Sequence, residues 1–153
     1  MNYITRERIH VDRIATAWAI RRFVDPDATF QFVPRTRDVR GMDGIPFDVR
    51  GAGLTHRGGR CTFEVLLETY ALDDPALKHM SRIIHSADLP QDEPSTGLAG
   101  GVLAIFDGVR DGSDTDAERL SRRLLNKPQR RLGRFRAIEQ RPAQATVRVT
   151  GEK

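Results

Sequence analysis

Cysteine is almost absent from this sequence: Cys61 is the only one, so no disulfide can form within the chain. This excludes a disulfide-stapled scaffold and agrees with a reducing compartment. No apolar run approaches the roughly twenty residues that a membrane-spanning helix needs, and 30% of the residues are charged. The N-terminal MNYITRER carries charge at once, unlike a secretory signal. We therefore expect a cytoplasmic protein with no membrane association.

Several catalytic motifs are also missing. There is no GxSxG nucleophile elbow, and neither GxxxxGK[ST] nor GxGxxG occurs, because Gly97, Gly100 and Gly101 lack the required spacing. Serine-hydrolase and nucleotide-binding chemistries are therefore less favoured by the sequence than a metal site. A nucleophile pair of Cys61 and His56 stays open, although it depends on two residues alone.

Acidic residues become scarce toward the C-terminus. Residues 1–117 contain 14 Lys or Arg and 18 Asp or Glu, whereas residues 118–153 contain 11 and 3. We expect one domain over residues 1–126 and a basic, flexible tail over residues 127–153. Such a tail can attract a polyanion, including nucleic acid, without sequence specificity. The alternative is a solvated basic helix with a frayed end.

The periodicity predicts an α+β fold, helix-rich, formed as a single domain with a small N-terminal sheet. Strands are expected at residues 3–9, 28–33 and 45–49, and the second of these alternates Phe30 and Phe32 with polar residues. Apolar residues at helical spacing predict helices at residues 13–24, 62–72, 75–87, 98–109 and 115–126. Whether residues 130–140 form a further helix stays open.

Local signals mark the ends of two of these helices. Asp12 is placed to cap the first helix, and Asp25 before Pro26 ends it, since a residue before proline leaves helical geometry. Asp74 before Pro75 is a helix start.

Metal-ligating residue types gather around the predicted helix at residues 62–72. Cys61 and Glu64 are three residues apart, so both can face the same point from the first turn. Imidazole, carboxylate and thiolate are the protein groups that bind transition metals. The candidate ligands near helix ends are His10, Asp12, His56, Cys61, Glu64, His85 and Asp88.

Taken singly, each candidate has an ordinary explanation. His56 can be an exposed loop histidine, and Cys61 a small buried hydrophobe. Glu64 in a first turn and His85 in a last turn both suit the helix dipole. Only their joint placement favours a shared site.

Three segments resemble one family, the C-terminal domain of chromate-resistance proteins. They are HVDRIATAWAIRRFVDPDATFQFV at 10–33, THRGGRCTFEVLLETYALDDPAL at 55–77 and IIHSADL at 83–89. The likeness covers residues 3–125 in order. The family's recurrent positions match the seven candidates above together with Arg13, Trp18, Arg21 and Arg22.

The resemblance implies a role in bacterial chromate resistance, where full-length members are described as chromate-responsive regulators encoded beside a chromate efflux transporter. Two departures stand out. The regulators carry an N-terminal region thought to bind DNA, whereas this chain begins at the shared domain. Their last helix is generally acidic and aromatic, whereas the stretch from residue 125 onward is basic here.

Together these observations predict a chromate-resistance domain that holds a divalent transition metal, Zn, Mn or Fe. We take His10, Glu64, His85 and Asp88 as ligands, with Asp12, His56 and Cys61 among or behind them. Arg13, Arg21 and Arg22 are expected to meet an oxyanion such as chromate, whose charges suit guanidinium groups. Three classes stay open: a metal-dependent enzyme, a non-catalytic sensor, and a nucleic-acid partner acting through the tail.

Overall fold

The computed structural model describes residues 1–8, 10–90 and 97–110, and its strands and helices alternate only in the first third of the chain. Three strands form the sheet: β1 (Asn2–Arg6), β2 (Thr29–Val33) and β3 (Ile45–Pro46). The helices are α1 (Val11–Ala19), its π-helical continuation η1 (Ile20–Val24), α2 (Thr62–Thr69), α3 (Pro75–Asp88) and α4 (Gly97–Arg110). The predicted α+β fold with a small N-terminal sheet is confirmed.

The sheet has the order β2-β1-β3, and both pairs are parallel. Parallel neighbours need a crossover connection, and α1 with η1 supplies it between β1 and β2. Tyr3 at the centre of the sheet is fully buried and stacks on Phe30 at 5.8 Å between ring centroids, with Phe47 edge-on at 6.4 Å. These rings hold the start of β1 against both neighbouring strands.

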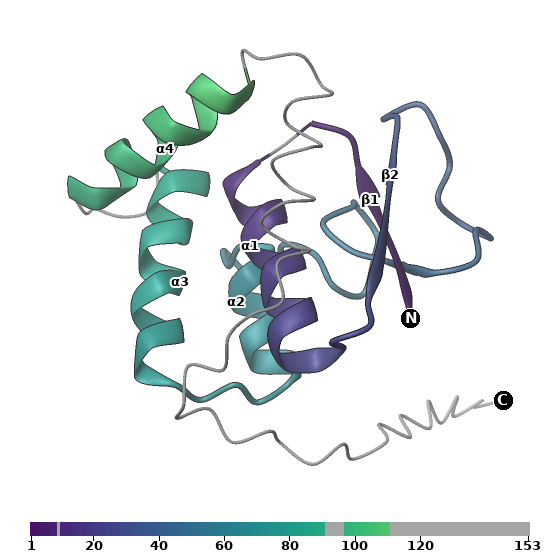
Figure 1. Cartoon of the computed structure of the whole chain (residues 1–153), viewed down its shortest axis with the longest axis horizontal. Helices are drawn as coiled ribbons and strands as arrows, with labels where there is room; N and C mark the ends of the chain where they lie inside the picture. Colours follow the sequence, from purple (N-terminus) through teal and green to yellow (C-terminus); the bar gives the residue numbers. More distant parts are fainter. Residues whose placement is uncertain (9, 91–96, 111–153) are drawn as a thin grey trace, which may run out of the picture.

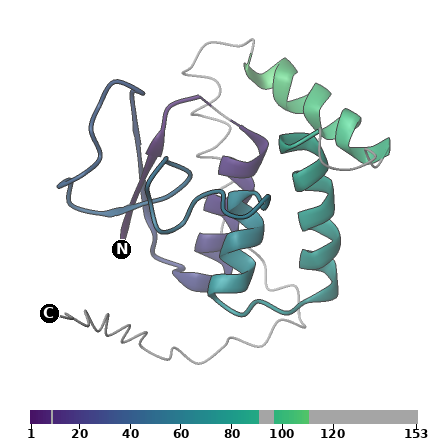
Figure 2. The same cartoon turned by 180° about the vertical axis from the view of Figure 1, so that it is seen from behind.

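The helices form layers beside the sheet. The sheet lies at one side of the domain and α3 at the other, with α1 and α2 between them (Figure 1, Figure 2). The helix α1 contacts α2, α3 and α4, and Phe63, Leu66 and Ile20 are fully buried where these elements meet. Burying such side chains contributes roughly 1.5–3 kcal/mol each, which fixes how the helix ends face one another.

Two predicted helix boundaries are confirmed. The helix from α1 through η1 ends at Val24, and the amide of Asp25 donates to the carbonyl of Ile20 over 2.8 Å. The carboxylate of Asp74 accepts from the first-turn amides of Ala76 and Leu77, so α3 begins as its Asp-Pro signal predicts.

Two local predictions need correction. The predicted strand at 45–49 is a strand only over Ile45 and Pro46, and Phe47 adds an isolated bridge to Leu54. The capping role predicted for Asp12 in the first helix is wrong, because α1 begins at Val11 and Asp12 is already its second residue. The Asp12 carboxylate instead turns toward the free amides of another helix, α2.

The predicted helix at 115–126, the open one at 130–140 and the basic tail at 127–153 lie outside the described residues, as does the domain end at residue 126. No helix within the described ranges is long and apolar enough to cross a membrane.

Candidate metal centre

Asp12 connects α1 to the start of α2. Its side chain is nearly inaccessible, with 1% of its surface exposed. The Oδ2 and Oδ1 atoms accept from the amides of Thr62 and Phe63 over 2.9 and 2.8 Å. First-turn amides have no partner within their own helix, so a carboxylate from a neighbour stabilises them. Burial opposes ionisation of Asp12, but these bonds and the one to His56 outweigh it and keep its pKa below the usual value.

The rest of the α2 start is satisfied by its own residues. The amide of Cys61 donates to Oε2 of Glu64 over 3.0 Å, and the Cys61 side chain accepts from the amide of Glu64 in a capping box. The capping box accounts for Glu64 in the first turn. Every early amide of α2 therefore has a partner, and the helix start is fixed in position.

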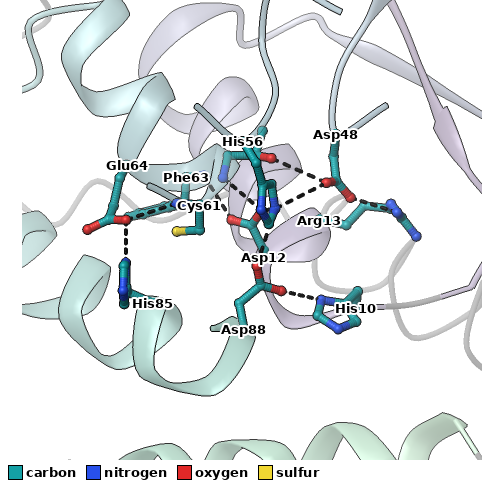
Figure 3. A network of polar contacts seen from close by, with 11 residues as sticks. His10, Asp12, Arg13, Asp48, His56, Cys61, Phe63, Glu64, His85 and Asp88 are labelled. Atoms are coloured by element: carbon teal, nitrogen blue, oxygen red, sulfur yellow. Dashed lines mark hydrogen bonds and ion pairs between the residues drawn. The ribbon is translucent and has the colours of Figure 1, made fainter. Parts of the chain in front are cut away.

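His56 stands at the centre of three carboxylates. Its Nε2 atom lies 3.1 Å from Oδ2 of Asp12, 3.2 Å from Oδ2 of Asp88 and 3.7 Å from Oδ1 of Asp48 (Figure 3). A single imidazole nitrogen carries at most one proton, so it can donate to only one of them fully. Hydrogen bonding to Asp12 raises the pKa of His56.

Asp48 belongs to this group although the sequence analysis missed it. Its backbone has a positive φ of 49°, in the left-handed region that Asp tolerates better than most residues. The amide donates to the carbonyl of Leu54 over 2.9 Å, which holds the turn. Burial raises the pKa of Asp48; the nearby guanidinium of Arg13 opposes this effect, and Asp12 adds to it.

Asp48 also holds the side chain of Arg13. Its guanidinium forms an ion pair of 2.7 Å with Oδ2 of Asp48 and donates to the carbonyls of Glu7 and Arg8. Both side chains of the pair are close to 90% buried. Arg13 thus ties the segment after β1 to the loop after β3.

Asp88, the last residue of α3, connects His10 to the group. Its Oδ1 lies 2.6 Å from Nδ1 of His10, and this hydrogen bond raises the pKa of His10. The Asp88 side chain is 3% exposed, and its Oδ2 has no hydrogen bond among the described residues despite lying close to His56. The side chains of His10 and His56 are 47% and 39% exposed, so the centre is open to solvent on their side.

A second group lies at the other side of the α2 start. Candidate ligand atoms of Cys61, Glu64 and His85 all lie within 4.8 Å of one another. Nδ1 of His85 is 2.7 Å from Oε2 of Glu64. Cys61 is fully buried, and this burial raises the pKa of its thiol far above the usual value. Atoms of Asp12, Asp48 and His56 satisfy the same 4.8 Å limit as a separate group.

The structure therefore divides the seven predicted ligands between two groups. The centre around His56 includes Asp12, Asp88 and His10, with Asp48 added; Glu64, His85 and Cys61 form the other (Figure 3). His79, the remaining histidine of the sequence, is exposed beside Arg82 and belongs to neither group.

The three predicted oxyanion residues do not converge. Arg21 donates to the carbonyl of Ala28 and its guanidinium lies 5.2 Å from the Phe30 ring centroid, while that of Arg22 lies 5.8 Å from Phe23. At about 1.5 Å of rise per residue, Arg21 is roughly 12 Å along the helix from Arg13. A shared oxyanion site of the three residues stays a prediction.

Fold and site define a small α+β domain whose polar centre is built from carboxylates and imidazoles at helix ends. The chain matches the family described as ChrB, C-terminal domain, over residues 3–125, and it belongs to that family. The resemblance stated from the residues is thereby confirmed. No solved structure matches the chain.

One curated relative is Protein ChrB of Cupriavidus metallidurans. It is 39% identical over 115 residues, which cover 74% of this chain and 35% of the relative. The chain thus spans about a third of that relative's length.

Proposed function

We propose that this chain is a chromate-resistance-type domain that binds a divalent transition metal through Asp12, Asp48, His56 and Asp88, and that it senses or processes an oxyanion such as chromate at that ion. The family membership supports the link to chromate resistance. The proposal of metal binding rests on the convergence of three carboxylates on one imidazole nitrogen.

The distances suit an ion. Two ligands about 2.1 Å from a metal, at right or tetrahedral angles, lie roughly 3.0–3.5 Å apart. The three carboxylate oxygens are 3.1, 3.2 and 3.7 Å from Nε2 of His56. Only small movements of these side chains are needed to place an ion among them.

The net charge of the centre also supports a divalent ion. With neutral imidazoles, three carboxylates face the single guanidinium of Arg13, which leaves an excess of two negative charges that a divalent ion would balance. The buried Oδ2 of Asp88 would also gain a partner. His10 then acts from behind, since its bond to Asp88 orients that carboxylate. An oxygen-rich set with one imidazole suits Mn²⁺ and Fe²⁺ as well as Zn²⁺.

Manganese is the sharpest probe of this centre because it has little affinity for thiolate. Chelator-treated protein is expected to take up one Mn²⁺ per chain, measured by loss of the free-ion electron paramagnetic resonance signal. At a hundredfold excess over Kd the ion should raise the free energy of unfolding by about 2.7 kcal/mol. Asp48→Asn and His56→Gln should weaken uptake by a hundredfold or more, since even residues behind the ligands contribute roughly 10–100-fold.

Asp38→Asn is the matched control. Asp38 is an exposed carboxylate paired with Arg40 away from the centre, so its replacement should leave uptake unchanged. If the folded wild-type protein takes up none of Mn²⁺, Zn²⁺ and Fe²⁺, the proposal is contradicted. Mn²⁺ uptake that survives in Asp48→Asn and His56→Gln would contradict it as well.

The oxyanion would meet the ion on the exposed side of His10 and His56. Arg13 already pairs with Asp48, so the metal rather than this guanidinium would supply the positive charge. Calorimetric titration with chromate or sulfate is therefore expected to show binding to Mn²⁺-loaded protein and none to metal-free protein. Arg21→Glu should retain it, because that residue lies roughly 12 Å from Arg13 along the helix.

Loss of anion binding in loaded Arg21→Glu or Arg22→Glu would instead assign the anion to those arginines, as the sequence predicts. If Mn²⁺-loaded protein binds no anion at all, the result supports the second candidate function. In that case the domain is a non-catalytic regulatory or interaction module, and the basic tail at residues 127–153 contacts nucleic acid.

A further inference from the structure

The group of Cys61, Glu64 and His85 has no part in the centre around His56. It lies where the last turn of α3 passes the first turn of α2 (Figure 3). Its carboxylate accepts both the amide of Cys61, over 3.0 Å, and Nδ1 of His85, at 2.7 Å, on the same Oε2 atom.

Helix capping explains only half of this arrangement. The capping box within α2 accounts for the bond between Glu64 and the amide of Cys61. It does not account for His85, which comes from another helix and points at the same oxygen. Nor does it require the residue at the cap to be the only cysteine of the chain, since serine or threonine caps a helix as well.

We infer that Cys61, Glu64 and His85 form a second, separate binding site for a thiophilic divalent cation of the Zn²⁺, Cd²⁺ or Co²⁺ kind. Sulfur, nitrogen and oxygen ligands from two helices are the donor set of tetrahedral sites for these ions. Three protein ligands leave one position for water or a further ligand. The side chains of Glu64 and His85 are 21% and 15% exposed, so an ion can reach the site from their side.

The geometry needs only a modest adjustment. Ligand atoms of a tetrahedral ion lie roughly 3.5 Å apart at bond lengths of about 2.0–2.3 Å. The three candidate atoms already lie within 4.8 Å of one another. The ion would take the place of the proton between His85 and Glu64, which widens that contact from 2.7 Å, and of the proton on the thiol.

The two sites differ in the ions that they select. Carboxylates and one imidazole accept Mn²⁺, whereas a thiolate ligand favours Cd²⁺ over Mn²⁺. The inference does not depend on the function proposed above, because the two groups share no side chain.

Cadmium titration of the full chain tests it. The chelator-treated protein is expected to develop the ultraviolet charge-transfer absorption of a cadmium–thiolate bond, which saturates with one Cd²⁺ per thiol. Cys61→Ser should abolish this absorption. Glu64→Gln and His85→Gln should each weaken Cd²⁺ binding at least tenfold. The glutamine at position 64 keeps the capping box of α2 intact. Circular dichroism confirms that each variant is folded.

Asp48→Asn separates the two sites. It is expected to lose Mn²⁺ uptake and to keep the cadmium–thiolate absorption. Folded wild-type protein that shows no such absorption would overturn the inference. So would absorption with unchanged affinity in both Glu64→Gln and His85→Gln, since the ion would then bind a lone thiol.

Discussion

Replacement of Asp12 by alanine is expected to lower the free energy of unfolding by about 3 kcal/mol, because it leaves two buried amides unpaired, at roughly 1–3 kcal/mol each. The amides of Thr62 and Phe63 both donate to this carboxylate, which is almost fully buried. The same change removes the hydrogen-bond partner of His56. Urea denaturation followed by circular dichroism measures the loss.

Asp12→Asn is the matched variant, since it keeps the shape and one oxygen acceptor. It should cost less than the alanine, about 1–2 kcal/mol, because one of the two amides retains its partner. Asp38→Asn, at an exposed carboxylate, should stay within roughly 0.5 kcal/mol of wild type. A loss below about 1 kcal/mol in Asp12→Ala would show that the α2 amides find other partners, and that Asp12 does not hold α1 to α2.

Arg13→Met is expected to cost about 3 kcal/mol or more. Removing one partner of a largely buried ion pair leaves the other charge uncompensated, which typically costs 3–5 kcal/mol. Arg13 pairs with Asp48 over 2.7 Å and also donates to the carbonyls of Glu7 and Arg8. Methionine keeps much of the side-chain volume, so the measured loss reports on the polar contacts.

A double-mutant cycle isolates the pair. In the Asp48→Asn background, Arg13→Met no longer leaves the carboxylate charge of residue 48 unpaired. Arg13→Met should therefore cost at least 1 kcal/mol less there than in wild type, within the 0.5–3 kcal/mol range of contacting residues. Additive losses would mean that Arg13 acts through the carbonyls alone. A stable Arg13→Met protein that keeps Mn²⁺ uptake but loses anion binding would restore the oxyanion role predicted from the sequence.

The two results bear on different parts of the site. Asp12 positions the α2 start, and Arg13 positions the loop that carries Asp48. Both residues come from the first turn of α1, the element that follows β1 in the chain. The parallel sheet therefore matters to the centre mainly because it fixes where this turn begins.

Much of the local structure could be predicted from the chain itself. Apolar spacing predicted α2, α3 and α4, the Asp-Pro signals marked two helix ends, and alternation of Phe30 and Phe32 predicted β2. Cys61 and Glu64 were expected to face the same point because they lie three positions apart in the chain, and they do form one group with His85. Such features depend on periods of a few residues, which sequence displays directly.

The partners across helices could not be predicted in this way. The pairing of Asp12 with the α2 amides joins residues about fifty positions apart. A capping residue has the same sequence pattern whether it caps the helix that follows it or a neighbouring helix. Asp48 had no local signal, since its role comes from a left-handed turn that brings it to Arg13 and His56. By itself, the sequence determined α1 to α4, most of the candidate residues and the family resemblance. Only the packing of α1, α2 and α3 decided that these residues form two groups rather than one, because the distances between helix ends are set by tertiary contacts.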